Sequence, residues 1–396
     1  MRIRSITCLV NATGDAIQAA GRLANEARTA FENAGLAVQT TRLATQPLSL
    51  LGGDPVRRAL GLWAQCAAAG MDYLSVGPVL ADTPGVDLSF IERIPDLIRA
   101  SGAVFCGVLV ARRGQGINLA AVRRTAWAIR DIAHTTDLGF GNLRLAALAN
   151  VGPGAPFFPA AYHDGGAPAV AIATESADLA VAVFSEAGSL DQVRDRLVDA
   201  VEAAARQIDS VVRPLAERHD FRFAGIDLTL APFPEQARSI GQAIERLGVD
   251  RVGAAGTLFA ASFITDCLRR SAYSRCGFNG LMLPVLEDAT LAERSRDGLF
   301  TVNDLLLYSA VCGTGLDTVP LPGDVTEEEL AGILLDMAAL AIRLDKPLTA
   351  RLMPVPGAQA GDMTTFDFDF FANGRVLAVK DLGSPGLFRR ADWVTI

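Results

Sequence analysis

The stretch IRSITCLVNATGDAIQAAGRLANEARTAFENAGLAVQTTRLA, residues 3–44, decides the fold class. It opens with a run of apolar and β-branched residues, continues with a helical segment that ends at Gly35, and returns to a second strand-like run, residues 36–44. Glycine is favoured at the end of a helix because the left-handed conformation costs it least. Two strands separated by a helix of this length indicate an α/β fold, arranged as a sheet or a barrel.

The alternation of strands and helices continues along the chain. Strand-like runs in the first half are DYLSVGPVL, AVFCGVLVA, LRLAALANV and AVAIATE. A long helix is predicted over residues 189–212, where apolar residues recur every three or four positions, and Pro214 should end or kink it. The second half adds RFAGIDLTLAPFP (222–234), NGLMLPVLED (279–288), LTARLMPVPG (348–357) and FDFDFFANGRVLAVKD (366–381) as predicted strands.

The domain organisation follows from what interrupts this pattern. We find no linker, no low-complexity tract and no repeat of fixed period in the sequence. Large α/β sheets and barrels often exceed the length of an average domain. We therefore expect a single α/β domain over residues 1–396, built of two similar halves at about 1–215 and 216–396.

Composition and charge exclude several functional classes. The chain has 396 residues, is 50% hydrophobic and carries a net charge of −8, and no basic stripe suggests nucleic-acid binding. No apolar run approaches the roughly 20 residues of a membrane helix, and the short run after the first two arginines favours a first strand over a signal peptide. The six cysteines are widely spaced without a CxxC pair, which is typical of reduced, buried thiols. The expected location is the cytoplasm.

The first candidate site is SAVCGTGLDTVPLPGD, residues 309–324. Its members are a thiol, two turn glycines and two carboxylates: Cys312, Gly313, Gly315, Asp317 and Asp324. Glycines permit a tight turn whose backbone N–H groups can bind an anion or an oxyanion. The functional interpretation is a catalytic thiol beside an anion-binding turn, with Asp317 as a catalytic carboxylate. The alternative is a buried core cysteine followed by a strand and a turn.

Two further strand exits carry polar side chains. In GPGAPFFPAAYHDGG, residues 152–166, His163 could act as a general base, a metal ligand or a substrate anchor, with Tyr162 as a neighbouring ligand contact. The alternative is an exposed loop histidine. Asp227 interrupts the apolar run GIDLTLAPFP, where α/β folds place ligand sites outside strand ends. Its alternative is an outward-facing residue on a half-exposed strand.

The remaining candidates are acids and an arginine near the C-terminal strands. Glu287 and Asp288 are consecutive, and carboxylates there could ligate Mg²⁺, Mn²⁺ or Ca²⁺, with Asn279 as a ligand contact. The alternative is that they open the next helix, where acids are favoured. Arg351 could clamp a carboxylate or phosphate bidentately. The predicted metal ligands are the four acids Glu287, Asp288, Asp324 and Asp362.

Taken together, these blocks resemble a known family. FFPAAYHDGG, GIDLTLAPFP, GTLFAASFITDCL, GFNGLMLPVLED and YSAVCGTGLDTVPLPGD look like signature blocks of domain-of-unknown-function family 711, as do RIRSITCLV and RLMPVPGAQAGDMTTF. The resemblance implies the fold of pyruvate formate-lyase, a ten-stranded α/β barrel with a loop inside. Glycyl radical activity is not expected, since the C-terminal segment ADWVTI and its surroundings lack an Arg-Val-x-Gly-aromatic motif.

Two functions of different classes remain open. The first is an enzyme acting on a small anionic metabolite inside the barrel, with Cys312 or His163 performing covalent or acid–base chemistry and Arg351 binding the anion. The second is a non-catalytic protein that binds an amino-acid-like ligand on the same barrel. The resemblance also implies association with an ACT-type protein, and a homo-oligomer is a further expectation. We expect no nucleic-acid and no membrane partner.

Overall fold

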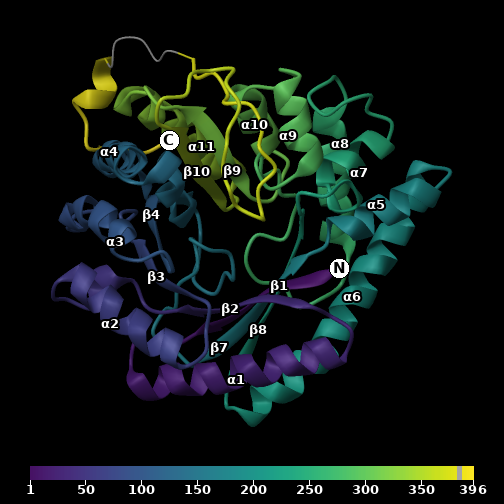
Figure 1. The fold of residues 1–396 in the computed structure, drawn as a ribbon, viewed down its shortest axis with the longest axis horizontal. Helices are drawn as coiled ribbons and strands as arrows, with labels where there is room; N and C mark the ends of the chain where they lie inside the picture. The colour runs from purple at the N-terminus through teal and green to yellow at the C-terminus, as the bar shows by residue number, and fades with distance from the viewer. Residues whose placement is uncertain (381–385) are drawn as a thin grey trace.

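The computed structural model describes residues 1–380 and 386–396. Its strands are β1 (Arg2–Leu9), β2 (Val38–Ala44), β3 (Tyr73–Val79), β4 (Val104–Arg112), β5 (Gly116–Asn118), β6 (Leu145–Ala149), β7 (Ala169–Glu175), β8 (Arg222–Ala231), β9 (Gly315–Pro322), β10 (Leu348–Val355) and β11 (Trp393–Val394). Its α-helices are α1 (Gly14–Asn33), α2 (Pro55–Ala68), α3 (Ile94–Ala100), α4 (Leu119–Thr135), α5 (Ala177–Glu186), α6 (Leu190–Arg218), α7 (Ile240–Arg246), α8 (Thr257–Arg270), α9 (Ala289–Arg296), α10 (Val302–Ser309) and α11 (Glu327–Leu344). Short 3-10 turns are η1 (Leu48–Leu50), η2 (Ser89–Arg93), η3 (Asp137–Arg144), η4 (Gln236–Arg238) and η5 (Gly386–Arg389). Figure 1 shows the helices on the outside and the strands within.

One continuous sheet is built from two parallel sets of strands. Its order is β8-β7-β1-β2-β3-β4-β6-β10-β9, with β5 joined to β4 and β11 joined to β5. The strands β1, β2, β3, β4 and β6 pair in parallel, and so do β7 with β8 and β9 with β10. The two sets meet antiparallel at β1–β7 and at β6–β10. Strand direction therefore changes between β6 and β7, well before residue 215.

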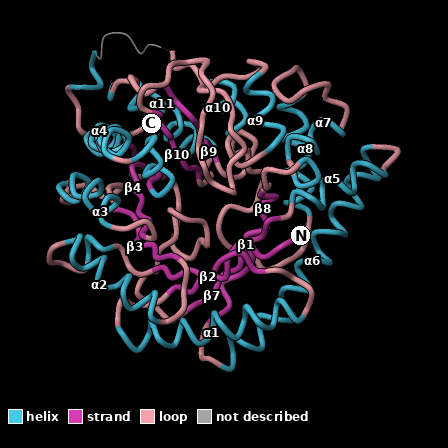
Figure 2. The backbone as a smooth tube through the Cα atoms, viewed as in Figure 1, coloured by secondary structure: helices cyan, strands magenta, loops and turns pink. Residues whose placement is uncertain are grey.

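A single segment, residues 274–285, contacts both ends of this sheet. Among the described residues, β8 and β9 do not pair directly. Instead, the Ile226 amide of β8 donates to the Ser274 carbonyl at 2.8 Å, and the Val285 amide donates to the Asp317 carbonyl of β9 at 3.2 Å. Both bridges are parallel, so the segment runs in the same direction as its two neighbours. Figure 2 shows the strands curving round a central space that loops occupy.

The first strand shows how the sequence builds two cores. Successive side chains of a strand point to opposite faces. On one face of β1, Cys8 packs toward α1 and its Sγ donates to the Ala20 carbonyl at 3.6 Å. On the other face, Thr7 Oγ1 donates to the Pro156 carbonyl at 3.4 Å, within the loop of residues 150–163. Leu9 packs into a smaller inner cluster with Phe158. Helices cover the outer face, and loops fill the inner one.

Several sequence predictions are confirmed. The fold is α/β, and strands and helices alternate through the first half as predicted. The cysteines are free thiols and all are buried except Cys276, which is half-buried. In the part of the chain that the structure covers, no helix combines the length and apolarity that crossing a bilayer requires.

Some details of the predicted local structure differ in the fold. Pro214 does not end α6, because the helix continues to Arg218. The buried side chains of Val212 and Leu215 on either side of the proline stabilise this last turn against the missing backbone donor. Residues 279–288 form bridges rather than a strand, since they cross from one sheet edge to the other.

The predicted strand at residues 366–381 is also wrong for its described part. An aromatic cluster organises this segment instead of a sheet. Phe368 packs edge-on against Phe140 and Phe371, with ring centroids 5.1 and 5.2 Å apart. The period-two alternation of FDFDF thus serves side-chain packing on one face without backbone pairing. Residue 381 lies outside the described residues.

Candidate functional site

A cavity of about 80 Å³ is lined by residues of β1, β2, β3, β4 and β10 and of the loops inside the sheet. Its polar wall consists of three arginines, one acid and two neutral groups: Arg4, Arg42, Arg351, Glu287, Gln39 and Thr40. Its aromatic wall consists of Tyr73, Phe105, Phe157, Phe158, Phe368 and Phe370. We call this space the arginine cavity. It lies at the amino ends of β3 and β4, which contribute Tyr73 and Phe105 to its wall.

A buried ion network forms one side of the arginine cavity. Arg351, on β10, donates from Nη2 to Glu287 Oε1 at 2.8 Å and from Nε to Asp317 Oδ1 at 2.5 Å. Arg4, on β1, forms an ion pair with the other oxygen of Glu287. Asp317 is fully buried, and its Oδ2 has no hydrogen-bond partner among the described residues. Four segments of the chain are therefore joined by charge at this wall.

The two carboxylates of this network differ in their proton affinity. Burial alone would raise the pKa of Glu287, but Arg4 and Arg351 together lower it. Burial raises the pKa of Asp317, Glu287 raises it further, and the single contact with Arg351 does not compensate. Glu287 touches two guanidinium groups and Asp317 touches one, which explains the opposite directions. The two arginines thus favour the ionised form of Glu287, and Asp317 has the higher proton affinity of the two.

Arg42, on β2, is the third arginine and has no carboxylate partner among the described residues. Its Nε donates to Thr40 Oγ1 at 2.8 Å, and its guanidinium lies 5.2 Å from the Phe158 ring centroid and 5.9 Å from that of Tyr73. Burial and the nearby charge of Arg4 lower the pKa of Arg42 to about 9. A guanidinium in this position is an uncompensated positive charge beside a cavity.

Aromatic contacts fix the rest of the wall. The rings of Tyr73 and Phe105 meet edge-on at 5.3 Å, and Phe105 and Phe158 follow at 5.4 Å. Phe157 packs edge-on against Phe278 at 5.3 Å and also lies under the guanidinium of Arg351, 5.5 Å from its ring centroid. Edge-on aromatic pairs of this spacing are favourable and geometrically specific. The phenylalanines therefore hold the arginines in place and exclude water from one side of the cavity.

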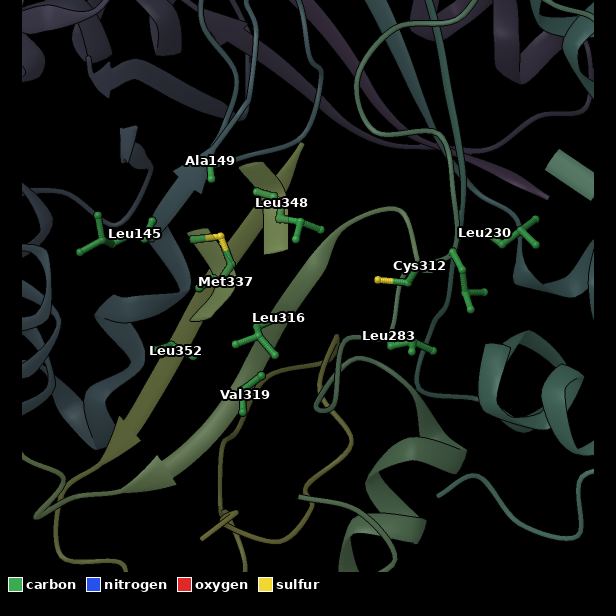
Figure 3. Packing of buried hydrophobic residues seen from close by; sticks show 14 of the residues in the cluster. Leu145, Ala149, Leu230, Leu283, Cys312, Leu316, Val319, Met337, Leu348 and Leu352 are labelled. Carbon is green, nitrogen blue, oxygen red and sulfur yellow. The ribbon is translucent and has the colours of Figure 1, made fainter. Parts of the chain in front are cut away.

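Cys312 does not lie at this cavity. It is 1% exposed and belongs to the main hydrophobic core. Figure 3 shows it among Leu230, Leu283 and Leu316. Its carbonyl accepts a hydrogen bond from Lys346, which caps the end of α10. The geometry matches the alternative of a core cysteine.

The two glycines after Cys312 are explained by close backbone approach. A Cβ on Gly313 would collide with the backbone of Gly280, and one on Gly315 would collide with the backbone of Thr349. The Gly313 amide donates to the Leu281 carbonyl at 2.8 Å, so it is already occupied. These positions therefore hold segment 274–285 and β10 against β9, and their amides do not face the arginine cavity.

His163 lies at a different place, next to the carboxyl end of β1. It is 3% exposed, and its Nε2 is 3.2 Å from the Gly166 carbonyl. Together with Asp164 and Arg222 it lines a separate cavity of about 40 Å³. Burial lowers the pKa of His163. The prediction of an exposed loop histidine does not describe it, because the loop folds into the sheet interior.

Tyr162, the residue before His163, is also buried. Its hydroxyl donates to the Val151 carbonyl at 3.3 Å, and burial raises its pKa. Tyr162 is absent from the wall of the arginine cavity as well. The loop that the sequence singled out therefore contributes Phe157 and Phe158 to that cavity, rather than its histidine or tyrosine.

Asp227 and Asn279 hold the bridging segment, residues 274–285, against β8 by hydrogen bonds. Asp227 accepts hydrogen bonds from the amides of Phe278 at 2.9 Å and Asn279 at 3.0 Å, and from Thr229 Oγ1. The Asn279 side chain accepts in turn from the Leu228 amide at 3.1 Å and the Tyr273 hydroxyl at 2.8 Å. Both side chains are used to shape the loop from inside, which is why Asp227 interrupts an apolar strand.

Sequence comparison with known proteins identifies the family of this chain. The family described as "Uncharacterised ACR (DUF711)" matches residues 1–369. The chain belongs to this family. A UPF0210 protein of Methanopyrus kandleri is 31% identical over 396 residues, covering 94% of this chain and 86% of the relative. UPF0210 proteins of Pyrobaculum arsenaticum and Corynebacterium glutamicum are 33% and 26% identical, covering 87% and 91% of this chain and 79% and 81% of the relatives.

The acids predicted as metal ligands are dispersed in this DUF711 protein. Asp288 caps two helices, accepting from the Leu291 amide at 2.8 Å and from the Ile240 amide at 2.6 Å, which matches the helix-opening alternative. Asp324 and Asp362 are exposed in turns away from Glu287. Within residues 1–380 and 386–396, no three His, Cys, Asp or Glu side chains gather as a metal site. The divalent cation stays a prediction.

Sequence reasoning missed two of the three cavity arginines in this DUF711 protein. Arg351 is identified from the sequence as an anion clamp, but neither Arg4 nor Arg42 is. A signal was present, since each arginine interrupts an otherwise apolar or β-branched strand in RIRSITCL and VQTTRLA. A charged side chain inside a strand that is covered on both faces requires a polar partner or a ligand.

Proposed function

We propose that this protein binds a small anionic metabolite in the arginine cavity and acts on it as an enzyme. The observation that carries the proposal is Arg42, whose charge is half-buried between two aromatic rings without a carboxylate partner in the described residues. A partly desolvated charge without a partner is less favourable than a paired one. An anion beside Arg42 would supply the missing partner.

The neighbours of Arg42 support an anion rather than a cation. Arg4 and Arg351 line the same cavity, and only Glu287 opposes them at its wall. Both oxygens of Glu287 are already engaged by those two arginines. A planar guanidinium offers paired donors that suit carboxylate and phosphate oxygens. The wall therefore presents donors to an incoming ligand and few acceptors.

Acid–base chemistry is the reaction class that these residues fit best. Asp317 lies directly behind Arg351, and burial raises its pKa, so it is our candidate proton carrier. Arg351 would position the anion, and the exclusion of water by the phenylalanines would strengthen each charge interaction. Cys312 and His163 remain candidates only if the chain rearranges, because neither lines this cavity.

The finer description of the fold belongs to the same proposal. We infer that the sheet is a barrel of the pyruvate formate-lyase type, with segment 274–285 completing the circle between β8 and β9. Five parallel strands on one side, and four strands plus this segment on the other, support the proposal. A barrel interior would shield the arginine cavity from bulk water.

A second candidate function is non-catalytic binding of an amino-acid-like ligand. The observation that favours it is the position of the two reactive side chains, since Cys312 is sealed in the core and His163 faces a separate, smaller cavity. A binding protein needs the arginines and the phenylalanines, and it needs neither the thiol nor the imidazole. Association with an ACT-type protein would fit this function and stays a proposal.

Native mass spectrometry tests the proposal most directly. The gently purified protein is measured before and after EDTA, alongside R42Q and the matched control R206A, whose arginine is 71% exposed on α6. We expect a small anion on the parent protein and on R206A, and its loss from R42Q. A mass lost with EDTA would instead reveal a divalent cation. Equal ligand occupancy in R42Q would contradict the proposal.

Turnover separates the two candidate functions. The acid that binds is supplied in isotopically labelled form, and products are sought with the parent protein and with D317N. Product from the parent, with binding but no product from D317N, would support the enzyme and its proton carrier. Binding without product in the parent, in the presence of the cell's small-molecule extract, would favour the binding protein.

A further inference from the structure

We propose that the ligand is a short monocarboxylate with an apolar tail, an inference that rests on the proposed function and deepens it. The first step is the charge count around the arginine cavity. Arg4 is paired with Glu287, and Arg351 is bonded to both Glu287 and Asp317. Arg42 alone lacks an acid among the described residues. One uncompensated positive charge selects one negative charge.

A second negative charge would be disfavoured at this wall. A dianion held by Arg42 would place its other charge near Glu287, which the arginines keep ionised. Like charges at short range in a poorly solvated site repel strongly. A phosphate or a dicarboxylate would therefore bind more weakly than a monocarboxylate of the same size.

The geometry at Arg42 fits a flat, two-oxygen group. Its Nε is occupied by Thr40 Oγ1, and the rings of Tyr73 and Phe158 lie near the guanidinium. The structure shows no partner for its terminal amino groups within the described residues. These groups form the fork that binds a carboxylate with two parallel hydrogen bonds.

Volume and lining limit the rest of the ligand. The cavity measures about 80 Å³. A cavity of about 150 Å³ holds one benzene molecule, so by the same ratio this one encloses about three non-hydrogen atoms, the size of a carboxylate group, and only a short tail would extend along its open side. The apolar part of its wall includes Phe105, Phe157, Phe368 and Phe370. A short hydrocarbon tail would gain by leaving water against these rings.

Calorimetric titration of the parent protein with matched probes tests the inference. The probes are propionate, its neutral counterpart propionamide, the dianion malonate and inorganic phosphate, all at one ionic strength set with potassium chloride. We expect propionate to bind at least tenfold more tightly than each of the others. Along the series acetate, propionate, butyrate and octanoate, affinity should rise to the three- or four-carbon acid and then fall.

The outcomes distinguish this inference from the proposed function. Malonate or phosphate binding as tightly as propionate would overturn the monocarboxylate and leave an anion site standing. Propionamide binding equally would overturn both, as would the failure of every anion to bind. In R42Q, propionate should lose at least tenfold in affinity and its advantage over propionamide. R42K, which keeps the charge without the fork, should recover part of the affinity and guards against a folding defect in R42Q.

Discussion

The arginine cavity and the region around Cys312 and His163 differ in whether their polar groups have partners. Around the cavity, three guanidinium groups face two carboxylates, so the charges are unbalanced beside an open space. Elsewhere, Cys312 is enclosed by apolar neighbours, and Nε2 of His163 lies 3.2 Å from the Gly166 carbonyl. Intrinsic reactivity made the thiol and the imidazole conspicuous in the sequence. An unsatisfied charge next to a cavity is the stronger indication of a ligand.

The largest effect that would sharpen this comparison is expected at Arg351. R351M leaves Glu287 and Asp317 buried without their shared partner, so the free energy of unfolding should fall by about 3–5 kcal/mol. Urea denaturation measures it. Neutralising both acids in R351M/E287Q/D317N should recover much of the loss. A fall below about 1 kcal/mol for R351M alone would show that the network is not desolvated as the structure indicates.

The next effect is expected at Arg42, in affinity rather than stability. R42M keeps the aliphatic part of the side chain near Tyr73 and Phe158 and removes the charge, together with the hydrogen bond to Thr40. We expect the affinity for the bound anion to fall at least tenfold, equivalent to about 1.4 kcal/mol. The free energy of unfolding should stay within about 1 kcal/mol of the parent, because no ion pair is lost. If R42M instead lowered the free energy of unfolding and left the affinity unchanged, Arg42 would be a structural residue rather than a ligand-binding one.

A smaller effect is expected at Cys312. C312A removes a buried thiol from the core, so the free energy of unfolding should fall by about 1 kcal/mol. Affinity for the anion, measured by the same calorimetry, should not change. C267A, which removes another buried thiol, is a matched control. If C312A alone weakened the binding of the anion, the thiol would belong to the site after all.

The smallest effect concerns His163 and acid. Burial lowers the pKa of His163. As the pH falls to about 6.5, the imidazole is therefore protonated in the unfolded chain but stays neutral in the folded protein. Stability from this residue is therefore lost as the pH falls through that region. The charged groups nearest to it are Asp164 and Arg222. Unfolding of H163Q, followed between pH 8 and 5, should depend less on pH than the parent; an equal or steeper dependence would contradict the burial of the imidazole.

Much of the fold could be predicted from the sequence because its signals are local. The strands β1 and β2 and the helix between them follow from periodicity and a terminal glycine, and the capping box at Thr326 marks the start of α11. The bridging segment could not be predicted as an irregular one. Its residues are as apolar as those of a typical strand. It bonds first to β8 and then to β9 because these two strands lie too far apart to pair directly.

The candidate site was predicted only in part, for a physical reason. Arg351 was expected to clamp a carboxylate, and it does, but the carboxylates belong to Glu287 and Asp317 of the same chain. Arg4 and Arg42 lie on neighbouring strands because β1 and β2 pair in parallel, and β1 has an irregularity between Ile3 and Ser5 in its pairing with β7. Strand pairing and register depend on the whole sheet, so no single motif predicts that these two arginines line the same cavity.

The segment of residues 274–285 has a further consequence for behaviour in concentrated solution. The outermost strands of a sheet carry unpaired backbone groups that can recruit other chains and start aggregates. Here the Ile226 and Leu230 amides of β8 and the Asp317 carbonyl of β9 are bonded to this segment. The same residues that shape the interior thus protect the edges of the sheet from other chains. Removing the carboxylate of Asp227, which bonds to this segment, should make the protein self-associate before it unfolds.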